Sequence, residues 1–245
     1  NDNNKRIKRI MAYTTINKSS DHFTTHLYSG NDSTNNQTSL GMTPDLVWVK
    51  CRNHATPSHY IVDKVRGDKK YISSNATTAE QTDSNTFDLV SGGFNLAGGN
   101  GWTNVSGRNY ASWNWKAGGG QGSSNTDGTI NTTYTSVNST AKFSISQYTG
   151  TGSNATFGHG LGVAPTFYII KETNSTGPWF VGHVPYTGDT GYVYLQSTGV
   201  GAASGQAFTT AKPTASLINL GTDVDVNQSG QTYIAYCFAE VAGFS

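Results

Sequence analysis

Three oxygen-bearing side chains alternate with two valines near the C-terminal end of the chain: Asp223, Asp225 and Asn227. On a β-strand, alternate side chains point to the same face of the sheet, so these carboxylate and amide oxygens could bind a calcium ion together. The run is not an EF-hand loop, because Gly230 follows two positions too late for the turn of that loop. The alternative is a strand edge that buries its two valines. Calcium is therefore the one cofactor that the sequence admits.

Aromatic side chains in turn-rich stretches indicate a second kind of chemistry, the binding of sugars. Flat rings stack on pyranose faces, while neighbouring Asn, Asp and backbone groups bond the hydroxyls. The aromatic side chains outside the best strand patterns are Trp102, Trp179, His183 and Tyr186. We expect these four to be glycan ligands, with packing caps on the core as the alternative. Trp48, Trp113 and Trp115 lie in strand patterns and are assigned to the core.

Residue patterns typical of catalysis do not stand out. His22 and His26 have an i, i+4 spacing, which brings side chains together only on a helix, whereas the surrounding pattern is extended. The Gly-rich runs at 118–120 and 158–162 lack the lysine and helix of a phosphate-binding loop. Glycan cleavage would need two carboxylates that flank the scissile bond, and the 15 Asp and Glu residues leave that alternative open. We expect a protein without enzymatic activity.

The elements that position these residues are indicated by an internal repeat. Three blocks recur in the same order at offsets of 120, 121 and 123 residues, as loop insertions between duplicated units would produce. The blocks are FTTHLYSG (23–30) and FSISQYTG (143–150), GMTPDLVWVK (41–50) and GVAPTFYIIK (162–171), and SGRNYASWNW (106–115) and SGQTYIAYCF (229–238). Within them, the continuous apolar runs at 46–49 and 167–170 predict central strands that are covered on both faces.

The repeat and the strand patterns predict an all-β fold. We expect two tandem jelly-roll or concanavalin-like β-sandwich units related by internal duplication, at residues 13–117 and 131–245, with roughly seven or eight short strands each. The Gly/Ser-rich stretch at 118–130 predicts a flexible linker. Residues 1–12 predict an N-terminal basic extension. Met11 resembles a normal translation start, and the alternative is a basic arm that docks on a partner.

Composition excludes several classes of partner. Asp, Glu, Lys and Arg make up 13% of the chain, about half the usual share, and the formal net charge is +1. A chain of this kind has no basic field for nucleic acid. No apolar stretch approaches the roughly 18 residues of a membrane span, and no secretory signal is visible. The two cysteines, Cys51 and Cys237, are expected to be buried or unpaired thiols.

Several segments together resemble structural proteins of marine bacteriophages of the cyanophage and pelagiphage type. The segments are MAYTTINKSSDHF, LYSGNDS, PDLVWVK, VDKVRGDKKY, NYASWNWKA, GSSNTDGT, YTGTGSNATFGHGLGVAPTF and YIAYCFAEVAGFS. The resemblance spans nearly all of residues 11–245. It implies a lectin-type β-sandwich and a place in the virion, and it carries no defined catalytic residues.

The resemblance also sets expectations about function. It implies a non-enzymatic virion component (a tail appendage, a fibre or a capsid decoration) that contributes to attachment to the host surface. The expected partners are other virion proteins, further copies of the chain in a trimer or symmetric ring, and a host-surface glycan. The alternatives are a receptor-binding lectin module, a glycan-cleaving tailspike and a bacterial surface adhesin, and the lack of a visible secretory signal weakens the adhesin.

Overall fold

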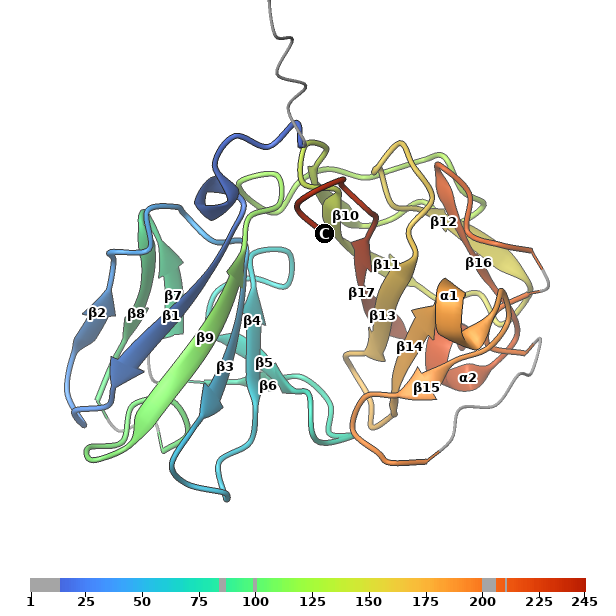
Figure 1. Ribbon diagram of the computed structural model, residues 1–245. Coiled ribbons are helices and arrows are strands. Elements are labelled where there is room, and N and C mark those ends of the chain that lie inside the picture. The colour runs from blue at the N-terminus through green and yellow to red at the C-terminus, as the bar shows by residue number, and fades with distance from the viewer. Residues whose placement is uncertain (1–13, 84–86, 99–100, 200–205, 210) are drawn as a thin grey trace, which may run out of the picture.

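The computed structural model describes residues 14–83, 87–98, 101–199, 206–209 and 211–245. The chain folds almost entirely into antiparallel β-sheets, which confirms the expected all-β sandwich class (Figure 1). Each half of the chain pairs a six-stranded sheet with a smaller sheet. The extension expected at residues 1–12 lies outside the described residues.

The first unit encloses its own core between two sheets. Alternate residues of one strand, such as Val47 and Val49, are buried with Phe94 and Leu96 of the opposite sheet, as the period of two requires. The large sheet has the order β1 (Phe23–Ser29), β9 (Asn109–Trp115), β3 (Leu46–Cys51), β4 (Tyr60–Asp63), β5 (Lys70–Ser73) and β6 (Gln81–Thr82). The small sheet has the order β2 (Asn35–Gln37), β8 (Gly93–Leu96) and β7 (Phe87–Val90).

The second unit has a similar plan. Phe157 and Ile218 of its small sheet are buried with Ile170 and Ala235 of its large sheet. The large sheet has the order β10 (Tyr134–Asn138), β11 (Phe143–Thr149), β17 (Thr232–Phe238), β13 (Phe167–Glu172), β14 (Trp179–His183) and β15 (Val193–Tyr194). The small sheet pairs β12 (Ala155–Gly158) with β16 (Leu217–Leu220). The second unit also has two short helices, α1 (Val184–Thr187) and α2 (Val224–Asn227), and the short helix η1 (Ser19–Asp21) precedes β1 in the first unit.

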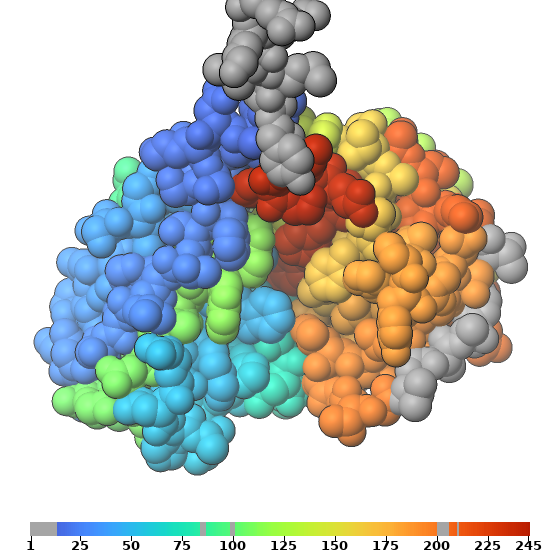
Figure 2. All heavy atoms as spheres, viewed as in Figure 1, coloured from blue at the N-terminus to red at the C-terminus, as the bar shows by residue number. Residues whose placement is uncertain are grey.

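The two large sheets pack against each other through the faces that the small sheets leave uncovered. Their shared apolar layer, which we call the inter-sheet core, includes Leu46, Ile61, Ile72, Ile145, Ile169 and Val181. Figure 2 shows the two units in contact from the red C-terminal segment down to the turquoise residues. The predicted double cover of the runs at 46–49 and 167–170 is therefore confirmed, and the second cover is the other unit. Each fully buried aliphatic side chain in this layer contributes about 1.5–3 kcal/mol.

The Gly/Ser-rich segment at 118–130 is bonded to both units rather than hanging between them. The backbone N–H of Gly119 donates to Oδ2 of Asp45 in the first unit at 2.9 Å. The N–H of Gly118 donates to Oγ of Ser136 in the second unit, also at 2.9 Å. The segment therefore acts as a fixed connection, although its composition predicts a free tether.

Matched tyrosine pairs occur in both units. Tyr28 stacks on Tyr110, and Tyr148 stacks on Tyr233, with ring centroids 5.1 Å apart in each pair. The hydroxyl of the first member also donates to a backbone carbonyl at 2.8 Å in the first unit and at 2.7 Å in the second. These contacts support the internal duplication, which stays a prediction.

Candidate functional site

One open pocket of the first unit combines aromatic rings with hydroxyl and amide groups. It lies where β4, β5 and β6 approach residue 102, and its volume is about 280 Å³. We call it the Trp102 pocket. It is lined by Ser58, Tyr60, Tyr71, Ser73, Ala76, Thr78, Gln81 and Trp102.

Two tyrosines form a rigid wall of the Trp102 pocket. Because Tyr60 of β4 lies opposite Ser73 of β5, Tyr71 takes the diagonal position on the same face. The two rings stack with centroids 3.9 Å apart and an interplanar angle of 12°. Burial, followed by the neighbouring Tyr71 and Asp83, raises the pKa of Tyr60. The Tyr60 phenol therefore stays neutral, and its ring is buried against that of Tyr71.

The remaining groups of the pocket suit a sugar. Trp102 is 40% exposed, so part of its indole surface is open to a ligand. Gln81 holds its amide in place by donating Nε2 to the carbonyls of Ala79 and Glu80 at 3.3 and 3.2 Å. Ser58 and Thr78 add hydroxyls at the lining. A flat ring next to fixed polar groups is the arrangement that binds pyranose rings.

Trp179 does not act as the glycan ligand that we expected. Its side chain is 0% exposed and belongs to the inter-sheet core, because β14 presents this residue to the first unit. Its Nε1 donates to the backbone carbonyls of Ser73 and Ala76, at 3.0 Å each. Both acceptors line the Trp102 pocket, so the second unit supports the pocket wall of the first.

The other two expected glycan ligands meet on the second unit. Tyr186, in α1, is 75% exposed, and its ring centroid is 6.5 Å from that of His183. His183 is half-buried against Phe167, with their centroids 6.0 Å apart. Neither residue lines the Trp102 pocket, so the four predicted ligands do not form one site.

The strand that the calcium prediction assumes is wrong, because Val224–Asn227 forms the helix α2. Asp223 caps this helix, and its Oδ1 accepts the N–H of Asp225 at 2.9 Å. Asn227 is buried, and its amide donates to the carbonyls of Ser153 and Gly221. Across the described residues, no three or more His, Cys, Asp or Glu side chains are grouped to hold a metal ion.

Asn227 has a structural counterpart at an offset of 123, which is the offset of the third repeat block. Asn104 is also buried, and its Nδ2 donates to two carbonyls, those of Ser33 and Ala97, at 2.6 and 3.0 Å. Each asparagine therefore ties its own loops together. Comparison of the two repeats at this offset would have revealed Asn227 as a structural residue.

A family model that is described as a domain of unknown function, DUF7483, matches the chain over residues 18–245. The chain belongs to the DUF7483 family. Because one model spans both sandwiches, the pair of units is the DUF7483 domain. No curated protein matches the chain, and no solved structure does. No helix among the described residues of this DUF7483 domain has the length and apolar character needed to cross a membrane.

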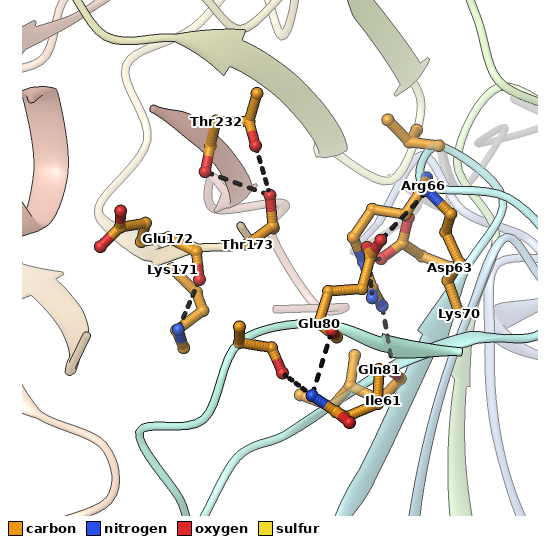
Figure 3. Close-up of polar contacts among 12 residues, drawn as sticks. Ile61, Asp63, Arg66, Lys70, Glu80, Gln81, Lys171, Glu172, Thr173 and Thr232 are labelled. Carbon is orange, nitrogen blue, oxygen red and sulfur yellow. Dashed lines mark hydrogen bonds and ion pairs between the residues drawn. The ribbon is translucent and has the colours of Figure 1, made fainter. Parts of the chain in front are cut away.

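Two carboxylates of the second unit approach each other, as glycan cleavage would require. Oε2 of Glu172 and Oδ1 of Asp225 lie 3.0 and 3.1 Å from the position of a Cβ built on Gly177. Burial raises the pKa of both carboxyls, and burial lowers the pKa of Lys171 to about 8. Figure 3 shows Lys171 next to Glu172. Glu172 is buried and Asp225 is partly exposed, so one carboxylate of the pair is closed off from solvent.

Proposed function

We propose that this chain is a non-enzymatic component of a phage particle that binds a host-surface glycan in the Trp102 pocket. The pocket is the observation that carries the proposal: stacked tyrosines, a partly exposed indole and fixed polar groups converge on one open volume. The place in a virion is supported by the sequence resemblance to marine phage structural proteins. The burial of Glu172 supports a role without glycan cleavage.

In this proposal, Trp102 and Tyr71 provide the apolar surface for a sugar ring, and Gln81 and Thr78 bond its hydroxyls. A pocket of this kind binds a single sugar weakly, because few atoms of the ligand become buried. Several copies on one particle would bind a surface polysaccharide much more tightly through their effective concentration. Attachment would therefore depend on assembly as well as on the pocket.

Replacing Trp102 with alanine is expected to weaken glycan binding about ten-fold or more, because it removes the exposed ring of the pocket. The purified wild type would first be screened on an array of bacterial surface polysaccharides. The best-binding glycan would then be titrated against both proteins by calorimetry, with circular dichroism to check the fold.

Tyr186→Ala is the matched control, because it removes a more exposed aromatic ring that does not line the pocket. Equal binding by wild type and Trp102→Ala, with a loss in Tyr186→Ala, would move the glycan site to the second unit. Release of new reducing ends from the bound polysaccharide would replace the binding role with cleavage.

The virion part of the proposal has its own test. Immunogold electron microscopy with an antibody against this chain is expected to label intact particles from the source. Label at the tail or fibres agrees with attachment, and label over the capsid indicates a decoration protein. Particles without label would overturn the virion role and leave the pocket to be explained in another setting.

A further inference from the structure

The strand β1 stands at one end of the strand order of the first large sheet. Within the described residues, β1 pairs with β9 alone. Lys116 N–H donates to the carbonyl of His22, and Gly30 N–H donates to that of Arg108. The even-numbered residues of β1 therefore form the backbone hydrogen bonds with β9. Because bonding alternates along an antiparallel strand, Phe23, Thr25 and Leu27 direct their N–H and C=O groups outward. Leu27 is also 61% exposed.

The second unit covers its equivalent edge with a strand. Its counterpart of β1 is β11, which pairs with β17 on one side and with β10 on the other. The partners of β10 on β11 include Phe143, Ile145 and Gln147. At the repeat offset of 120, these three correspond to the three outward residues of β1. The first unit therefore has an acceptor position for a strand like β10.

The chain contains a second segment with a sequence similar to that of β10. Residues 134–138, which form β10, read YTSVN, and residues 13–17 read YTTIN. The described residues 14–17 of this segment do not form a strand on β1. Instead, Ile16 is buried against Ala141, Val241 and Phe244 at the end of the second unit.

We propose that the β1 edge accepts residues 14–17 of a second copy of this chain. The turn η1 directs the segment away from its own β1, through bonds from Asp21 N–H to the Lys18 carbonyl and from His22 N–H to the Ser19 carbonyl. Pairing within one chain would break this turn, whereas donation to a neighbour leaves it intact and releases Ile16 alone. A long open edge with an exposed leucine also favours strand addition.

Donation of one segment to the next copy is a head-to-tail contact, which closes into a ring when the rotation between copies permits it. This inference does not rest on the proposed function, because it concerns the purified chain without a glycan or a particle. Its failure would leave the Trp102 pocket unaffected, and failure of glycan binding would leave the strand exchange unaffected.

Cysteine cross-linking tests the exchange in a predicted register. In the second unit, Thr135 lies opposite Ser146 with their hydroxyl oxygens 3.2 Å apart. Thr14 corresponds to Thr135 in the alignment of YTTIN with YTSVN, at an offset of 121, and His26 corresponds to Ser146 at the offset of 120, so we expect Thr14 opposite His26. The single variants Thr14→Cys and His26→Cys would be purified, mixed and oxidised. We expect a disulfide-linked heterodimer on a non-reducing gel. The native Cys51 and Cys237 are buried and remain in place.

Two further variants make the result decisive. Thr14→Cys mixed with Thr25→Cys is the control, because adjacent residues of a strand point to opposite faces, and this pair should not cross-link. Thr25→Pro removes an outward N–H and leaves the bonds to β9, so the fold should persist while light scattering falls to the monomer mass of 26.1 kDa.

Two outcomes would overturn the proposal. The first is a disulfide within one chain in the double variant Thr14→Cys/His26→Cys, which would show that each chain covers its own edge. The second is a wild type of monomer mass together with no disulfide between the mixed single variants Thr14→Cys and His26→Cys.

Discussion

Replacing Arg66 with methionine is expected to lower the free energy of unfolding by about 3–5 kcal/mol. The guanidinium is fully buried, with Nε donating to Asp63 Oδ2 at 2.6 Å and Nη2 donating to the Ile61 carbonyl at 3.0 Å (Figure 3). Without it, the buried Asp63 carboxylate loses its counter-charge. Urea unfolding at neutral pH measures the loss directly.

Lys18→Met is the matched control for Arg66, because its ion pair with Asp21 is exposed to solvent, with the two side chains 63% and 51% exposed. Exposed pairs of this kind contribute about 0–1 kcal/mol, so the control should remain close to wild type. Equal losses of unfolding free energy in the two variants would show that the buried pair stabilises the fold no more than an exposed pair does. A double-mutant cycle with Tyr236→Phe would extend the test to the other unit, since the Tyr236 hydroxyl donates to Asp63 at 2.7 Å.

Replacing Trp179 with alanine is expected to cost about 3–5 kcal/mol of stability and to weaken glycan binding as well. The substitution removes a large side chain from the inter-sheet core and leaves a cavity between the units. It also frees the carbonyls of Ser73 and Ala76, which line the Trp102 pocket. Thermal unfolding and the glycan titration would be measured on the same preparation.

Trp179→Phe separates the two effects, because it keeps most of the ring and removes the indole N–H. We expect a smaller loss of stability, near the 1–3 kcal/mol cost of unpaired buried carbonyls, together with weaker glycan binding. Tyr186→Ala should change neither property. If Trp179→Phe bound glycan like the wild type, the support of the pocket by the second unit would be refuted.

Strand patterns predicted much of the fold, because a period of two in burial follows directly from strand geometry. The continuous runs at 46–49 and 167–170 also indicated cover on both faces. Their pattern could not identify the covering element, since any apolar layer produces the same sequence signature. The sequence predicts Trp179 as a glycan ligand in a loop for the same reason. Its partners, Ser73 and Ala76, lie about a hundred residues away in the chain, so the local pattern does not reveal them.

The candidate site was predicted in part. Trp102 lines the pocket as a partly exposed ring, while Tyr60 and Tyr71 were missed because their strand pattern resembles that of core residues. The strand prediction for Asp223–Asn227 is wrong for a local reason. Its alternation predicted a strand, but Asp223 accepts the N–H of Asp225 and starts a helical turn instead.

The contact of Ile16 with Val241 and Phe244 has a mechanical consequence. The first described residues and the last residues of the chain meet at one end of the molecule (Figure 1). Polypeptide that continued from either of these points would leave from the same side. Tension between the two points would therefore load one small apolar cluster, and the sheets would carry little force. A domain inserted into a longer chain in this way would project from the side of that chain and would not lengthen it.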